Sequence, residues 1–130
     1  MKYEVICVFL GGGIGSVGRY LIQMLLHERI LPHQFPWSTF CVNIVGSLVI
    51  GIGYTLSSHL NLSAESRLLL TTGFCGGFTT FSTFSQDSVS LLKQGYYETF
   101  VLYLLLSILL GISAAFLGAF GAENALFLKK

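Results

Sequence analysis

Long stretches without a charged side chain most constrain what this chain of 130 residues can fold into. Asp, Glu, Lys and Arg do not occur in residues 30–64, 68–86 or 99–122. The first apolar stretch, residues 5–26, contains one charged residue, Arg19. A helix that spans a membrane needs about 20 mostly apolar residues. The charge-free stretches therefore predict several membrane spans.

Composition agrees with a membrane protein. The chain is 53% hydrophobic and 10% charged, whereas soluble domains are about a quarter charged. The net charge of +1 does not suggest a nucleic-acid partner. We expect an all-α membrane protein, residues 1–130 forming one domain, with four transmembrane helices at about 4–26, 37–58, 67–92 and 98–121.

Four spans would place both termini on the same side of the membrane. Positive charges usually favour the cytoplasmic side, but their bias here is weak. An antiparallel, dual-topology homodimer is therefore plausible. The charges on the side of the termini would be Lys2, Arg67, Lys129 and Lys130, against Arg29 and Lys93 on the other side, with Arg19 leaning that way.

The third predicted span is polar in its second half. Nine of the twelve residues in 79–90 carry a hydroxyl, an amide or a carboxylate. Unsatisfied polar groups in hydrocarbon each cost several kcal/mol, roughly, so this segment cannot face lipid. It is expected to line a protein interior or a water-filled path, which favours a transport function.

Glycines precede this polar segment. Gly73, Gly76 and Gly77 lie at mid-membrane and are followed by two threonines. We expect the helix to break at these glycines, with a half-helix beginning near Thr79. Unwound backbone at this depth must be buried in protein, and its freed carbonyls suit a hard cation.

Two other spans carry distinctive patterns. Gly11 and Gly15 in the first span form a small-xxx-small pair that favours close helix packing, with Arg19 on the same face. Arg19 either extends to the interface or attracts an anion. In the second span, Asn43 either links helices or donates a hydrogen bond to an anion. It belongs to a four-residue repeat of Thr39, Asn43, Ser47, Gly51 and Thr55.

Residues typical of catalysis do not group together. His27, His33 and His59 lack paired metal-ligand spacing, and no nucleophile has a nearby base in the sequence. We therefore predict that the chain is not an enzyme.

Three segments, GGIGSVGRY at residues 12–20, TFCVNIVGS at 39–47 and GFCGGFTTFSTF at 73–84, resemble the Fluc/CrcB fluoride channel family. They occur in the family's order and near its spacing. The resemblance implies a fluoride-selective channel that exports fluoride passively across a bacterial inner membrane. It also implies an antiparallel homodimer with two pores and a structural sodium ion at the dimer interface.

The resemblance also implies roles for individual residues. Sodium would be held by the backbone carbonyls of Gly76 and Thr79. Gly111 stands where some relatives carry a pore-facing serine, so Ser107 or water would replace that hydroxyl. The residues matched to the fluoride pore are Asn43, Phe81, Phe84, Ser82, Thr83, Thr39, Tyr103, Ser107 and Arg19.

Two alternatives remain open at this point. A small four-span multidrug or cation exchanger would need a membrane-embedded carboxylate, for which Asp87 is the candidate. A structural subunit of a membrane complex would pass no ion.

Overall fold

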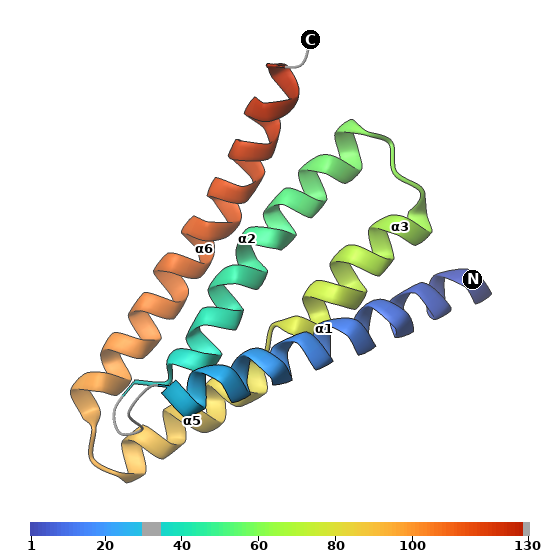
Figure 1. Cartoon of the computed structure of the whole chain (residues 1–130). Coiled ribbons are helices and arrows are strands. Elements are labelled where there is room, and N and C mark those ends of the chain that lie inside the picture. The colour runs from blue at the N-terminus through green and yellow to red at the C-terminus, as the bar shows by residue number, and fades with distance from the viewer. Residues whose placement is uncertain (30–34, 129–130) are drawn as a thin grey trace.

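The structure, a computed structural model, describes residues 1–29 and 35–128, with only the backbone described for residues 27–29. All regular elements in these ranges are helical (Figure 1). In chain order they are α1 (Lys2–Arg29), α2 (Trp37–His59), α3 (Ala64–Leu68), the π-helix η1 (Leu69–Cys75), α4 (Gly76–Phe78), α5 (Phe81–Lys93) and α6 (Tyr97–Phe127).

The helices confirm the predicted all-α fold. Three of them, α1, α2 and α6, are long and apolar enough to cross a membrane. The third predicted span, at about 67–92, corresponds to α3, η1, α4 and α5 in succession. Three charges used in the topology argument, Lys129, Lys130 and the side chain of Arg29, lie outside the described residues.

Helices α2 and α6 pack side by side and run in the same direction (Figure 1). A Cβ atom built on Gly51 would collide with the backbone of Ala115, and one on Gly118 would collide with the Leu48 carbonyl. Small residues therefore let the two backbones approach closely, as expected for helices in lipid.

Helix α1 packs in the same manner against η1 and α4. A Cβ on Gly11 would collide with the Leu69 carbonyl oxygen, and a Cβ on Gly15 would collide with that of Phe74. From the other side, a Cβ on Gly77 would collide with the Gly12 carbonyl oxygen. The predicted packing role of the first-span glycines is confirmed.

The predicted break in the third span is present, but its position differs from the prediction. The glycines at 73, 76 and 77 remain helical, and the chain becomes extended at Thr79 and Thr80. The second half-helix begins at Phe81, two residues after the predicted start near Thr79. The glycines do not break the helix because they lie in η1 and α4, where Gly73 and Gly77 allow α1 to approach.

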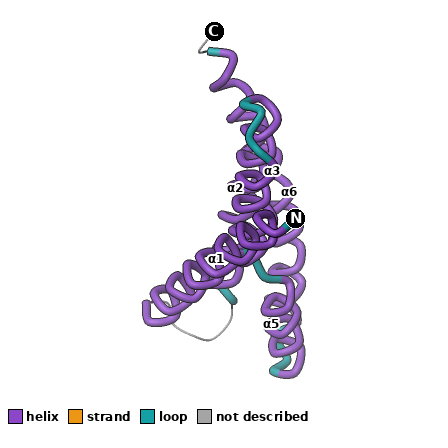
Figure 2. The backbone as a smooth tube through the Cα atoms, turned by 90° about the vertical axis from the view of Figure 1, so that its right-hand side faces the viewer, coloured by secondary structure: helices purple, strands orange, loops and turns teal. Residues whose placement is uncertain are grey.

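Helix α5 leans away from α1 (Figure 2). Within residues 1–29 and 35–128 it contacts α2 and α6 but not α1. Four of its exposed residues recur at helical spacing and form one surface, here called the α5 face; Phe81 and Leu92 are exposed as well. The α5 face consists of Ser82, Gln86, Val89 and Lys93.

An aromatic cluster anchors α5 to the start of α2 and α6. Phe40, Leu91 and Tyr103 are buried together, with Phe35 and Phe84 packed against them. Tyr103 is fully buried. This cluster fixes the orientation of α5 beside the break.

Candidate functional site

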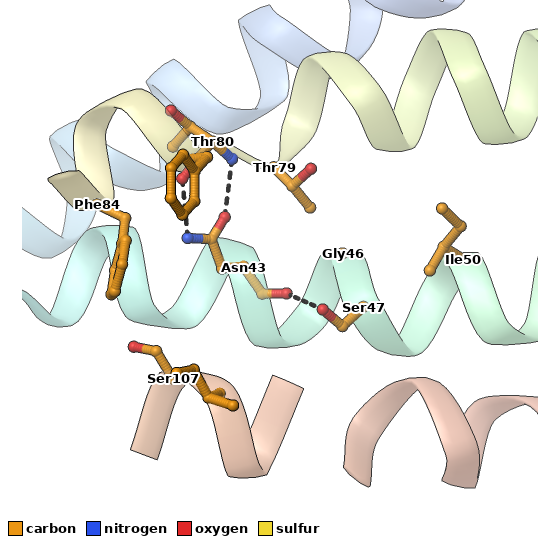
Figure 3. A pocket seen from close by; sticks show the side chains of 10 residues that line it. Asn43, Gly46, Ser47, Ile50, Thr79, Thr80, Phe84 and Ser107 are labelled. Atoms are coloured by element: carbon orange, nitrogen blue, oxygen red, sulfur yellow. Dashed lines mark hydrogen bonds between the residues drawn. The ribbon is translucent and has the colours of Figure 1, made fainter. Parts of the chain in front are cut away.

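The break is held by the side chain of Asn43 on α2. Its Oδ1 accepts a hydrogen bond from the backbone N–H of Thr80 at 2.8 Å, and its Nδ2 donates to the Thr80 carbonyl at 3.0 Å (Figure 3). One amide thus satisfies both backbone groups of a residue that belongs to no helix. Such pairing is required because unsatisfied buried backbone is costly. The interhelical role considered for Asn43 is therefore confirmed.

Thr80 also begins α5. Its Oγ1 accepts a hydrogen bond from the backbone N–H of Thr83 at 3.2 Å, which is the geometry of an N-cap. The same hydroxyl donates to the Thr83 side chain at 3.0 Å and lies 3.2 Å from the Ser82 hydroxyl. The hydroxyls of Ser82 and Thr83 thus belong to a small network at the start of the half-helix.

A pocket of about 340 Å³ lies beside the Asn43–Thr80 pair (Figure 3). Its wall is mainly apolar, with a few polar groups from α2, the break and α6. This composition is typical of a small-ligand site. The pocket is lined by Asn43, Gly46, Ser47, Ile50, Thr79, Thr80, Phe81, Phe84, Ser107 and Ile108.

Two phenylalanines form one end of the pocket. The ring centroids of Phe81 and Phe84 are 5.7 Å apart, and their planes are tilted by 35°. Phe81 is 79% exposed, whereas Phe84 packs against Tyr103 with centroids 5.0 Å apart. One ring is therefore fixed by the aromatic cluster, and the other lies on the surface of the protomer.

Hydroxyl groups lie on the α2 and α6 walls. The Ser107 hydroxyl is buried and has no hydrogen-bond partner in the described part of the chain. Ser47 donates to the Asn43 carbonyl at 2.7 Å. Its Oγ lies 3.8 Å from the position of a Cβ built on Gly111. Ser47 thus places a hydroxyl next to the position where Gly111 provides none.

Two of the remaining predicted pore residues, Thr39 and Tyr103, form a second cluster with Asp87. The Tyr103 hydroxyl donates to the Asp87 carboxylate at 3.3 Å, and Thr39 lies near the same carboxylate. Thr39 is 2% exposed. This cluster adjoins the pocket through the contact between Tyr103 and Phe84. The Asp87 carboxylate on α5 therefore has a donor from α6.

The predicted site residues do not all meet. Asn43, Thr79, Phe81, Phe84 and Ser107 share the pocket, while the others lie outside it. Arg19 is partly buried on α1 and is not among the pocket-lining residues of the described chain. Ser82 and Thr83 surround the cap, and Thr39 and Tyr103 adjoin Asp87. Of the predicted sodium ligands, Gly76 is the first residue of α4 and Thr79 directly follows this helix.

Sequence reasoning missed two residues of the site. Ser47 was recognised as part of the four-residue repeat with Asn43 but was not assigned to the pore, although that repeat places it on the same face. Thr80 is the residue that Asn43 holds. A threonine directly before a helical segment is a cap signal, which the polar composition of the segment concealed.

Comparison with known proteins identifies the family. A family model described as CrcB-like protein, Camphor Resistance (CrcB), matches residues 6–119. A protein of Bacteroides fragilis is 56% identical over 123 residues, covering 93% of this chain and 97% of the relative. A protein of Phocaeicola vulgatus is 48% identical (92% and 98% covered), and one of Leptospira interrogans is 41% identical (93% and 95% covered).

All three relatives are named Fluoride-specific ion channel FluC. An ion channel is not an enzyme, which agrees with the expectation from the sequence. Both the family model and the relatives cover most of the chain, so the resemblance of the three segments extends over the whole membrane domain. The chain therefore belongs to the CrcB family.

Proposed function

We propose that this protein is a fluoride-selective channel that lets fluoride leave the cell passively and so lowers its intracellular concentration. The observation that carries the proposal is the pocket, in which uncharged donors and aromatic rings meet beside a helix break. The names of the relatives support the choice of ion.

Fluoride is small and strongly hydrated, so a pore must replace its water with fixed donors. The buried Ser107 hydroxyl supplies one donor that no described residue uses. Asn43 Nδ2 has two hydrogens, of which the Thr80 carbonyl accepts one. Aromatic ring edges carry partial positive charge, so Phe81 and Phe84 stabilise an anion while excluding water. Neutral donors bind weakly enough to let the ion leave again.

A second copy of the chain is the proposed partner. The α5 face bears Ser82 and Gln86 and is not covered by the protomer's other helices. Polar side chains at this depth require protein or water, not lipid. An antiparallel, dual-topology homodimer would cover these surfaces and complete two pores, one on each side of the dimer axis.

A structural sodium ion is proposed at the dimer interface. Gly76 is exposed, and a Cβ built on it would meet no atom within 4 Å, so its backbone is accessible from outside the protomer. Thr79 is extended directly after α4, where helical hydrogen bonding ends. Carbonyl oxygens from both residues of two copies would suit a hard cation. Such an ion would neutralise partial charges of unpaired carbonyls within the membrane.

We place the protein in a bacterial inner membrane as a multi-pass protein. The relatives come from bacteria, and the four helical spans suit a lipid bilayer.

The test is ion efflux from liposomes that contain the purified protein. We expect rapid loss of fluoride and little loss of chloride. Phe84→Ile removes a ring edge at nearly the same apolar character and should reduce fluoride efflux at least about tenfold, because one lost interaction of 1.4 kcal/mol has this effect. Phe81→Ile should do the same.

Phe116→Ile is the matched control, because Phe116 is 67% exposed on α6 and lies outside the pocket. Equal efflux of fluoride and chloride would refute selectivity, and no efflux of either ion would favour the structural-subunit alternative.

A further inference from the structure

At the break, two backbone N–H groups donate to side chains and not to the carbonyls they would meet in a continuous helix. In an uninterrupted α-helix, each N–H donates to the carbonyl four residues earlier. The Thr80 N–H would then donate to the Gly76 carbonyl. It donates instead to Asn43 Oδ1 at 2.8 Å. Asn43 thus diverts the helical donor of Gly76.

A second diversion occurs one turn later. The Thr83 N–H would donate to the Thr79 carbonyl in a continuous helix. It donates instead to the Oγ1 of Thr80 at 3.2 Å. The two carbonyls whose helical donors are diverted by side chains are therefore those of Gly76 and Thr79. These are also the two proposed ligands of sodium.

The same residues form part of the pocket wall. Asn43, Thr79 and Thr80 all line the pocket, and a Cβ on Gly46 would collide with the Thr79 side chain. The carbonyl pair and the pocket wall thus belong to one short backbone segment. A displacement of Thr80 would move both.

We propose that Asn43 and Thr80 are positioning residues for the sodium site, and that Asn43 couples this site to the pocket. Their side chains take the donors that would otherwise pair with the Gly76 and Thr79 carbonyls, and so keep both oxygens available. The inference depends on the proposed sodium ion. Because coupling between two binding sites is reciprocal, a change at Asn43 must alter sodium affinity as well as the pore.

The experiment measures sodium binding without measuring ion flow. Thermal unfolding of the purified full-length protein in detergent is followed as sodium chloride replaces N-methylglucamine chloride at constant ionic strength. An ion that binds the folded state raises its melting temperature by mass action, and the sodium concentration at half-effect reports affinity. We expect such a rise in the wild-type protein.

Asn43→Ala and Thr80→Ala should each raise the half-effect concentration by about tenfold, the factor expected when a hydrogen bond that holds the site is lost. Thr80→Ser should keep the wild-type value, because serine supplies the same cap oxygen. Ser107→Ala is the matched control in the pocket: its side chain bonds nothing at the break, so the sodium half-effect should not change.

Indifference of the wild-type protein to sodium would overturn the inference. An unchanged half-effect in both alanine variants would also overturn it, as would an equal shift in Ser107→Ala. If Asn43→Ala does not fold, the difference between Thr80→Ala and Thr80→Ser decides the matter. Rapid fluoride efflux from a protein indifferent to sodium would refute this inference while leaving the proposed channel function intact.

Discussion

The interface of α1 with η1 and the α5 face differ in how much of each surface is covered by the protomer itself. At the first, glycines bring two backbones so close that a single Cβ at Gly15 would collide with the Phe74 carbonyl. On the α5 face, Ser82 and Gln86 are exposed on the surface of the protomer. The first surface is complete within one chain. The second requires water or another protein surface, so the two surfaces differ in whether one chain alone can satisfy them.

The largest effect is expected at the glycine interface. Gly15→Val inserts a branched side chain against the backbone of Phe74, which cannot move without displacing η1. Overpacking of this kind costs about 1–3 kcal/mol or more. We expect most of the monodisperse protein peak to be lost in size-exclusion chromatography in detergent.

Gly13→Val is the control, because a Cβ at Gly13 meets no atom within 4 Å. If Gly15→Val and Gly13→Val gave equal yields of monodisperse protein, the close approach of α1 and η1 would be wrong.

At the α5 face, the direction in which the melting temperature changes distinguishes contact with lipid from contact with protein or water. Gln86→Leu would stabilise a helix that faced lipid, because it removes an amide from hydrocarbon. We expect the opposite, a melting temperature lower by a few degrees, which corresponds to about 1 kcal/mol. Ile112→Gln is the reciprocal change at a position of α6 that is 67% exposed and expected to face lipid, and it should also lower the melting temperature.

A higher melting temperature for Gln86→Leu would place the α5 face against lipid. It would also remove the main structural support for a second copy.

The acid beside the pocket provides a third test. Tyr103→Phe removes the hydroxyl that donates to Asp87 at 3.3 Å and leaves a charged acceptor with one donor fewer. The loss should be about 1–3 kcal/mol in the free energy of unfolding. Asp87→Asn should retain fluoride efflux, whereas a proton-coupled exchanger would lose its transport with this change.

In the double variant Tyr103→Phe/Asp87→Asn, we expect the two losses of stability to be less than additive, because they remove the same interaction. Strict additivity would show that Tyr103 and Asp87 do not depend on each other.

Much of the fold follows from the sequence. The uncharged stretches predicted four spans, and the Gly11–Gly15 spacing predicted close packing of the first. The polar residues 79–90 predicted that the third span lines a protein interior or a water-filled path, and the glycines before them predicted its break. These features are readable because lipid imposes strong local rules on charge, size and backbone pairing.

The position of the break was not readable in this way. The glycines at 76 and 77 suggested it, yet both remain helical, Gly77 packs against α1, and the chain becomes extended at Thr79 and Thr80. Its immediate partner is Asn43, which lies 37 residues earlier in the chain. A local pattern cannot reveal a hydrogen bond made across that separation. For the same reason, sequence spacing could not divide the predicted pore residues between the pocket and the cluster around Asp87.

The most direct test is the reversal potential of currents through the reconstituted wild-type protein, with fluoride on one side of a planar bilayer and chloride on the other. Uncharged donors that replace fluoride's hydration predict a reversal potential set almost entirely by the fluoride gradient. A reversal potential near zero under equal concentrations of the two halides would contradict the account, because the pocket would then not distinguish fluoride from a larger anion.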